Sequence, residues 1–299
     1  EGDLMLNKDF SVAIHASSTD TILLKAVNRF VQTLNRKTAL YFVNKEVSFN
    51  DKSDTSALQI FVNKKASPTP GSDESYTLSI DGQKMELKAP TTIGAMHGLQ
   101  TIIQLLSKNF DGRFYFPSVS IEDAPRFAWR GLIIDVARHF IPLDVIKRNI
   151  EAMEVVKMNV LHLHLSDNEG FRLESKIFPQ LQNKGSNGEY YTQVQMKELI
   201  AFAKERGIMI VPEFDMPGHS KSWFAGYPQL SASKDSSKAL MSLHFNELGK
   251  LDLAKVMEYA RTIPMPAMDP TKESTYDFID RLIGEMSTIF PSAYFHIGA

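Results

Sequence analysis

The sequence contains no cysteine among its 299 residues, which excludes disulfide bonds, thiolate nucleophiles and cysteine-ligated zinc. It also has no run of about 18 apolar residues, so it predicts no membrane-spanning helix. Basic charge is not in excess, since 33 Lys and Arg stand against 35 Asp and Glu for a net charge of −2. A protein that binds a phosphate backbone needs a basic surface, so we expect no nucleic-acid partner.

Residues 1–124 alternate short strand and helix patterns. The predicted strands cover 10–16, 58–64 and the two arms of a hairpin at 76–89, and the predicted helices cover 20–36 and 91–106. Asp81-Gly82 is typical of a tight two-residue hairpin turn with positive φ angles. Titratable groups do not cluster here. We therefore interpret residues 1–124 as a small α+β domain with a structural, non-catalytic role.

Residues 125–299 show a β-α alternation after Ala124-Pro125. The predicted strands cover 131–137, 159–165, 208–214 and 293–298, and the predicted helices cover 144–158, 192–207 and 274–290. Thr192 and Gln195 form a capping box. The stretch between Trp223 and Met268 is interpreted as a long insertion with a short helix at 251–262. Four strands in this order predict a parallel sheet that is half of an eight-stranded barrel.

Polar residues follow three consecutive predicted strands. Arg138 and His139 come after the first, Asp167 after the second, and Asp215 and His219 after the third. The carboxyl ends of parallel strands lie at one edge, so we expect these residues to be neighbours. The guanidinium of Arg138 suits sugar hydroxyls or a carboxylate, and Asp167 and His219 are a plausible orienting pair. We expect His139 to be packed instead.

His162 and His164 alternate along the second predicted strand, which places both imidazoles on one face. Such a pair can bind a metal in hydrolase barrels. The two histidines can also form a packed polar layer, and we favour this interpretation. A metal-dependent hydrolase that uses His162 and His164 therefore remains an alternative, and we predict no metal and no cofactor.

Five ordered motifs resemble the β-N-acetylhexosaminidases of glycoside hydrolase family twenty. They are RGLIIDVARHF, HLHLSDNEGFRLE, VPEFDMPGH, MDPTKESTYDFIDRLIGEM and AYFHIGA, between 126 and 299. The segment TTIGAMHGLQTIIQLL also looks like part of the α+β domain that precedes the barrel in that family. The resemblance implies a (β/α)8 TIM barrel, of which this chain holds strands 1–4, behind that domain. It also implies substrate-assisted removal of terminal β-linked N-acetylhexosamine.

The resemblance assigns roles to three residues. Arg138 matches an arginine that binds the ring hydroxyls of the sugar, and Asp167 and His219 match a pair that supports the general acid. In the family the last strand continues into a catalytic Asp-Glu pair, which would come next after Ala299. We therefore expect the 299-residue chain alone to be inactive. Asn168 and Phe171 stand where relatives more often have Asp and Trp, and Phe171 keeps an aromatic for packing.

A second interpretation is a non-catalytic sugar-binding or scaffolding fragment. Its open sheet edges would invite aggregation or pairing with another copy, so a homo-oligomer is a further expectation. The expected partners are N-acetylhexosamine-containing glycans or chito-oligosaccharides. The expected location is periplasmic or secreted. The preference for GlcNAc or GalNAc does not follow from the sequence.

Overall fold

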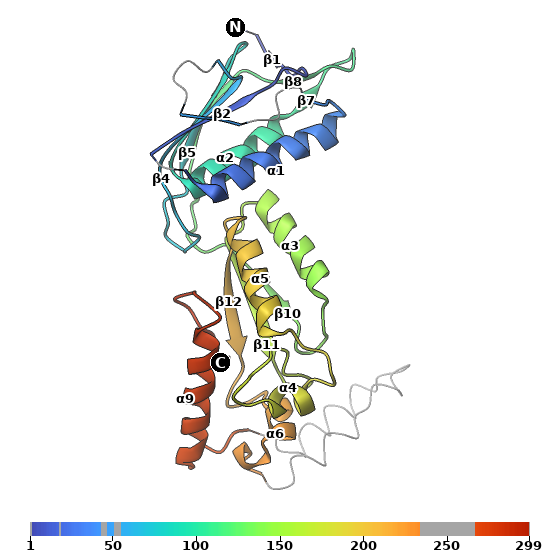
Figure 1. The fold of residues 1–299 in the computed structure, drawn as a ribbon, viewed down its shortest axis with the longest axis vertical. Helices are drawn as coiled ribbons and strands as arrows, with labels where there is room; N and C mark the ends of the chain where they lie inside the picture. The colour runs from blue at the N-terminus through green and yellow to red at the C-terminus, as the bar shows by residue number, and fades with distance from the viewer. Residues whose placement is uncertain (1, 18, 43–46, 51–54, 234–266, 299) are drawn as a thin grey trace. The chain divides into compact units, whose positions relative to one another are not determined.

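The computed structural model describes residues 2–17, 19–42, 47–50, 55–233 and 267–298 (Figure 1). The chain divides into two compact units. Unit 1 comprises Glu1–Gly131, Lys147–Val160 and Phe202–Met209, and unit 2 comprises Leu132–Ile146, Leu161–Ala201 and Ile210–Ala299. A domain boundary after residue 124 stays a prediction. In the described ranges, no helix combines the length and hydrophobicity that a membrane crossing requires.

Unit 1 is built on a six-stranded sheet with the order β3-β2-β4-β6-β5-β9. The strands are β2 Val12–Ala16, β3 Ser48–Phe49, β4 Leu58–Lys64, β5 Tyr76–Ile80, β6 Met85–Thr91 and β9 Val119–Asp123. The first four in the order are parallel, and β5 and β9 run antiparallel to their neighbours. Buried and more exposed residues alternate along β4 and β5, as expected of a sheet with one covered face.

Two helices, α1 Thr21–Thr38 and α2 Thr92–Leu105, cover that face of the sheet (Figure 1). Asp20 caps α1, because its side chain accepts a hydrogen bond from the N–H of Ile22 at 2.9 Å. A smaller sheet with the order β1-β8-β7 completes the unit, from strands β1 Leu4–Met5, β7 Ser107–Lys108 and β8 Phe114–Phe116. The helices and longer strands match the sequence prediction. Neither the smaller sheet nor β9 was predicted.

The predicted turn of the β5–β6 hairpin is wrong. The strands end at Ile80 and resume at Met85, so the loop has four residues and not two. The side chain of Asp81 accepts hydrogen bonds from the N–H groups of Gln83 at 2.8 Å and Lys84 at 2.9 Å. This Asx turn replaces the positive φ angles that a two-residue loop would need, and Gly82 does not have one.

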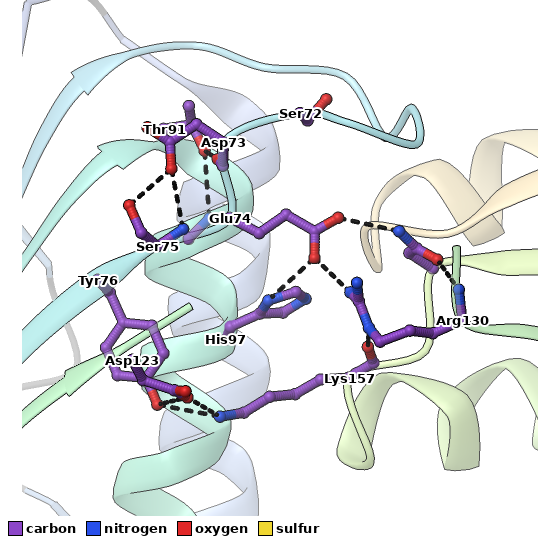
Figure 2. Close-up of polar contacts among 12 residues, drawn as sticks. Ser72, Asp73, Glu74, Ser75, Tyr76, Thr91, His97, Asp123, Arg130 and Lys157 are labelled. Carbon is purple, nitrogen blue, oxygen red and sulfur yellow. Dashed lines mark hydrogen bonds and ion pairs between the residues drawn. The ribbon is translucent and has the colours of Figure 1, made fainter. Parts of the chain in front are cut away.

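A buried carboxylate, Glu74, joins several parts of unit 1 (Figure 2). Its Oε2 accepts from Nη2 of Arg130 and lies 3.5 Å from Nδ1 of His97, and its Oε1 accepts from Nδ2 of Asn159 at 3.0 Å. The Glu74 side chain is only 3% exposed. Burial and the nearby Arg130 and Lys157 charges lower the pKa of His97 to about 3, so this imidazole is neutral.

Lys157 forms a second polar cluster beside it (Figure 2). Its ammonium group donates to the hydroxyls of Tyr76 at 3.0 Å and Thr101 at 2.8 Å, and to Asp123 at 3.0 Å. Lys157 has a positive φ of 58°, which places it in the left-handed region just after a helix. These contacts fix the backbone just before strand β11, Val160–Ser166.

The β-α part contains a three-stranded sheet with the order β10-β11-β12. Its elements are β10 Gly131–Asp135, α3 Leu143–Val155, β11 Val160–Ser166, α5 Gln193–Lys204 and β12 Met209–Phe214. The predicted capping box of α5 is confirmed, because the N–H of Thr192 donates to Gln195 and the N–H of Gln195 donates back, at 2.8 and 3.2 Å. The sequence did not predict three short helices, α4 Gln180–Gly185, α6 Lys221–Gly226 and η1 Pro228–Leu230.

Helix α9, Glu273–Ser287, ends three residues earlier than predicted. After it the chain returns beside β12, where the N–H of Phe214 donates to the carbonyl of His296 at 3.1 Å. Only an isolated parallel bridge between Glu213 and His296 forms here, so the predicted strand at 293–298 is an extended segment. The helix predicted at 251–262 lies outside the described residues.

Candidate active site

The structure brings Arg138, Asp167 and His219 together in unit 2, just beyond the carboxyl ends of β10, β11 and β12. The Arg138 Nη2 atom lies 2.6 Å from Asp167 Oδ2. On the other side, Nδ1 of His219 lies 3.0 Å from Asp167 Oδ1. Residues up to 81 positions apart in the sequence therefore meet at one carboxylate.

Asp167 is the centre of this group, with a side chain that is 1% exposed. Burial alone would raise the pKa of its carboxyl group. Hydrogen bonds from His164, the N–H of Asn168 and His219, with the Arg138 charge, instead lower that pKa to about 2. Asp167 is thus a permanent anion near neutral pH, able to orient an imidazole and to balance a cation.

Arg138 is anchored through its backbone and through its guanidinium group. Its backbone N–H donates to Oδ1 of Asp135 at 3.0 Å, and its Nη1 donates to Oδ2 of Asp135 at 2.6 Å. The side chain nevertheless remains 51% exposed. The two carboxylates hold the guanidinium in a fixed plane, and the exposed part of this fork can reach a ligand.

His219 sits in a constrained turn after β12. Its φ is 51°, in the left-handed region that a non-glycine residue adopts at a cost of roughly 1 kcal/mol. The following helix is held near Asp167, because the N–H of Lys221 donates to Oδ1 of Asn168 at 3.2 Å. The imidazole is 45% exposed. It can therefore contact Asp167 through one nitrogen and present its other edge to a ligand.

Phe171 packs as expected behind this site. It is fully buried and meets the ring of Trp223 edge to face, with centroids 5.3 Å apart. His139 differs from the expectation, because it is exposed and not packed. Asp215 is partly buried, and burial raises the pKa of its carboxyl group.

His162 and His164 lie on one face of β11, as their alternation predicts. They meet Glu213 of β12, whose Oε2 lies 2.6 Å from Nε2 of His162 and 3.0 Å from Nδ1 of His164. His164 also reaches Asp167, with 3.0 Å between Nε2 and Oδ2. This links the polar layer directly to the candidate site, which sequence reasoning missed. The available signal was Glu213 itself, a carboxylate inside the otherwise apolar strand IMIVPEF.

Three groups of side chains could hold a metal ion among the residues that the structure describes. They are His162 with Glu213 and His296, His164 with Glu213 and Asp215, and Asp167 with Asp215 and His219. Imidazole and carboxylate are donors that zinc accepts. The same donors, however, already face one another as ion pairs. The absence of a metal stays a prediction.

Family models match almost all of this chain. The model described as glycosyl hydrolase family 20, catalytic domain, matches residues 127–299, and one described as beta-acetyl hexosaminidase like matches residues 2–105. The beta-hexosaminidase subunit beta of Rattus norvegicus is 35% identical over 256 residues, which cover 84% of this chain and 44% of that protein. The beta-hexosaminidase of Vibrio furnissii is 35% identical over 249 residues, which cover 77% and 38%.

Solved structures agree with these matches. The chitobiase of Flavobacterium johnsoniae superposes with a TM-score of 0.86 at 35% identity, over 100% of this chain and 42% of that one. An exo beta-N-acetylglucosaminidase of Vibrio harveyi, solved with N-acetylglucosamine, gives 0.75 at 26% identity, over 100% and 44%. The predicted fold class, the first part of a TIM barrel behind an α+β domain, is confirmed. The chain spans about two fifths of the length of the curated relatives it matches.

Proposed function

The chain belongs to glycosyl hydrolase family 20, and from that premise we propose that its protein is a β-N-acetylhexosaminidase. It would remove terminal β-linked GlcNAc or GalNAc from glycans or chito-oligosaccharides, with retention of configuration. The observation that carries the proposal is the buried Asp167 anion, held between Arg138 and His219 at the carboxyl ends of the strands. The names of the relatives, hexosaminidases and a chitobiase, support the substrate class.

The proposed reaction is substrate-assisted. The 2-acetamido oxygen of the sugar attacks its own anomeric carbon, and the bond to the leaving oxygen breaks. In the family, an Asp-Glu pair performs the acid-base work, with the Asp orienting the acetamido group and the Glu protonating the leaving oxygen.

The described residues would support that chemistry from one side. The exposed part of the Arg138 guanidinium would donate to ring hydroxyls, while Asp135 and Asp167 keep it in place. The Asp167 anion would hold the tautomer of His219 through Nδ1, and the other edge of His219 would face the general acid. Neither step requires a metal or a cofactor. We also propose a periplasmic or secreted location, and self-association stays an expectation of the sequence.

The test uses the full-length protein and a chromogenic N-acetylglucosaminide. We expect Arg138→Ala to lower kcat/KM at least about a hundredfold, because hydrogen bonds to a charged donor contribute about 1.5–3 kcal/mol each. The control is Arg113→Ala, which breaks an Arg–Asp pair on a side chain that is 70% exposed. Equal kinetics for both variants would show that Arg138 does not contact the substrate. Stoichiometric zinc in the active protein, ligated by Asp215 or His219, would instead favour a metal-dependent hydrolase.

A further inference from the structure

The two oxygens of Asp167 face different partners. Oδ1 accepts from Nδ1 of His219 at 3.0 Å and from the N–H of Asn168 at 2.6 Å. Oδ2 faces Nη2 of Arg138 at 2.6 Å and Nε2 of His164 at 3.0 Å. The orientation of the carboxylate toward His219 therefore depends on what holds Oδ2. Of these two Oδ2 partners, Arg138 is half exposed, whereas the His164 side chain is only 5% exposed.

His164 has a carboxylate oxygen on each side of its ring. Its Nε2 faces Asp167 at 3.0 Å, and its Nδ1 faces Oε2 of Glu213 at 3.0 Å. A neutral imidazole has one N–H and one lone pair, so it would point a lone pair at one of the two anions. Only the imidazolium places an N–H against both. The placement of His164 between two carboxylates therefore favours its positively charged form.

The surroundings of His164 favour that charge. Burial by itself would lower the pKa of His164, but the contacts with Asp167 and Glu213 and the charge of Asp135 raise it to about 9. Asp135 belongs to β10, Glu213 to β12, and Asp215 follows β12. The basic groups nearby are Arg138, His162 and His296. Burial lowers the pKa of His162, which leaves that imidazole less able to compete for the proton.

Glu213 is the second anchor of this arrangement. Its side chain is 8% exposed, and its oxygens lie within 3.3 Å of nitrogens of His162, His164 and His296. Among the described residues, Oε2 makes no hydrogen bond of good geometry, so its attraction to His164 is chiefly between charges. The result is a series of alternating charges that runs from the half-exposed Arg138 through the buried Asp167 and His164 to the buried Glu213.

We propose that His164 and Glu213 are positioning residues of the candidate active site. Glu213 keeps His164 protonated, and the His164 cation orients the Asp167 carboxylate so that its Oδ1 accepts from His219. Neither residue needs to touch the substrate. The catalytic consequence rests on the proposed hexosaminidase function, whereas the charge state of His164 does not.

The first measurement is the protonation of His164 in the full-length protein labelled with 15N-histidine. At pH 8 we expect one histidine whose two ring nitrogens both carry protons, and whose signals disappear in His164→Gln. If no histidine of the unmodified protein carries protons on both ring nitrogens at pH 8, the inference is overturned without any variant having to fold. In Glu213→Gln, the same signals should titrate at least one pH unit lower than in the unmodified protein.

The second measurement is the pH profile of hydrolysis. If removal of the Glu213 charge brings the pKa of His164 to about 7, only about a tenth of it is protonated at pH 8. We therefore expect kcat of Glu213→Gln to fall about tenfold from pH 6 to pH 8, relative to the unmodified enzyme, with KM little changed. The matched control is His162→Gln, two residues along the same strand, which contacts Glu213 and not Asp167.

The outcomes separate the two proposals. The His162→Gln profile should keep the basic limb of the unmodified enzyme, whatever its overall rate. A Glu213→Gln profile that parallels the unmodified one would contradict the positioning role, because a purely structural loss lowers activity equally at every pH. A full-length protein with no hexosaminidase activity would refute the proposed function, and the 15N signals would still decide the charge of His164.

Discussion

The Glu74 carboxylate offers a direct test of how unit 1 is held together. Replacing it in Glu74→Gln keeps the side-chain shape and removes the charge. Arg130 then loses its anionic partner but keeps two backbone acceptors, the carbonyls of Lys157 at 2.8 Å and Phe127 at 2.7 Å. The amide N–H2 of the new glutamine would also face either the guanidinium of Arg130 or the Nδ2 group of Asn159. Both of these groups are donors, so the N–H groups would meet without an acceptor.

The expected loss follows from these contacts. A hydrogen bond to a charged group contributes about 1.5–3 kcal/mol, and breaking a buried ion pair on one side costs about 3–5 kcal/mol. The Arg130 side chain is still 19% exposed and retains its backbone acceptors, so the lower part of that range applies. We expect Glu74→Gln to lower the free energy of unfolding of unit 1 by about 3 kcal/mol.

The control is Glu86→Gln in strand β6 of the same unit. Glu86 pairs with Lys84 and Lys88, whose side chains are 51% and 58% exposed. Exposed pairs of this kind contribute less than about 1 kcal/mol. Both variants remove one carboxylate charge from unit 1, so their difference isolates burial and contact geometry from net charge.

The assay is urea unfolding followed by tryptophan fluorescence. The chain has two tryptophans, the partly exposed Trp129 in unit 1 and the fully buried Trp223 in unit 2. A Trp223→Phe background leaves Trp129 as the reporter of unit 1, and the background change cancels between variants. Midpoints convert to free energies through the urea slope. Losses for Glu74→Gln and Glu86→Gln that agree within about 0.5 kcal/mol would refute the reasoning.

Three further predictions concern pH and capping. The pKa of Asp167 is about 2 in the fold against 3.8 ordinarily, so its contribution of about 2 kcal/mol is present above pH 3.8 and lost toward pH 2. Acid unfolding of Asp167→Asn should lack that slope. His97 is held neutral with a pKa of about 3, so the free energy of unfolding should fall as the pH drops from 6.5 toward 3, by at most about 1.4 kcal/mol per pH unit. If the stability of His97→Gln falls as steeply with pH as that of the unmodified protein, this reasoning is wrong. Thr192→Ala should cost about 1 kcal/mol in urea unfolding through loss of the cap on Gln195, and an unchanged midpoint would show that this cap is energetically silent.

The sequence predicted the elements whose signal is local. Helix α1 shows apolar residues at helical spacing with Asp20 at its N-cap, and β4 alternates between buried and exposed residues. The two-residue strands of the smaller sheet have no such signal. β1 exists only because Leu4 and Met5 pair with Phe116 and Tyr115, more than a hundred residues away. Pairing at that distance depends on the folded chain and not on local pattern.

The site was predictable in part for the same reason. The rule that parallel strands end at one edge identified Arg138, Asp167 and His219 from their positions after strands. The rule could not identify Glu213, because it concerns residues after a strand, and Glu213 lies within a strand whose other residues are apolar. Nor could it show that His164 turns toward Asp167. The prediction of a two-residue turn at Asp81-Gly82 failed for a different reason. The Asp81 side chain accepts a hydrogen bond from a backbone N–H of the loop, so the loop closes without positive φ angles.

Burying a charged group between strands normally loses more free energy in hydration than it gains, unless a partner of opposite sign lies against it. In this protein the cations and anions alternate from Arg138 to Glu213, so each anion in the series lies within 3.0 Å of a cation. Apolar side chains of similar size would pack at lower cost, and they could not keep an imidazole charged or hold a carboxylate in one orientation. Two buried members of this series, His164 and Glu213, lie on β11 and β12, the strands that also lead to Asp167 and His219. An arrangement of this kind specifies one geometry of the site, because each charge in the series lies against a neighbour of opposite sign, and the loss of one removes an attraction that holds the next.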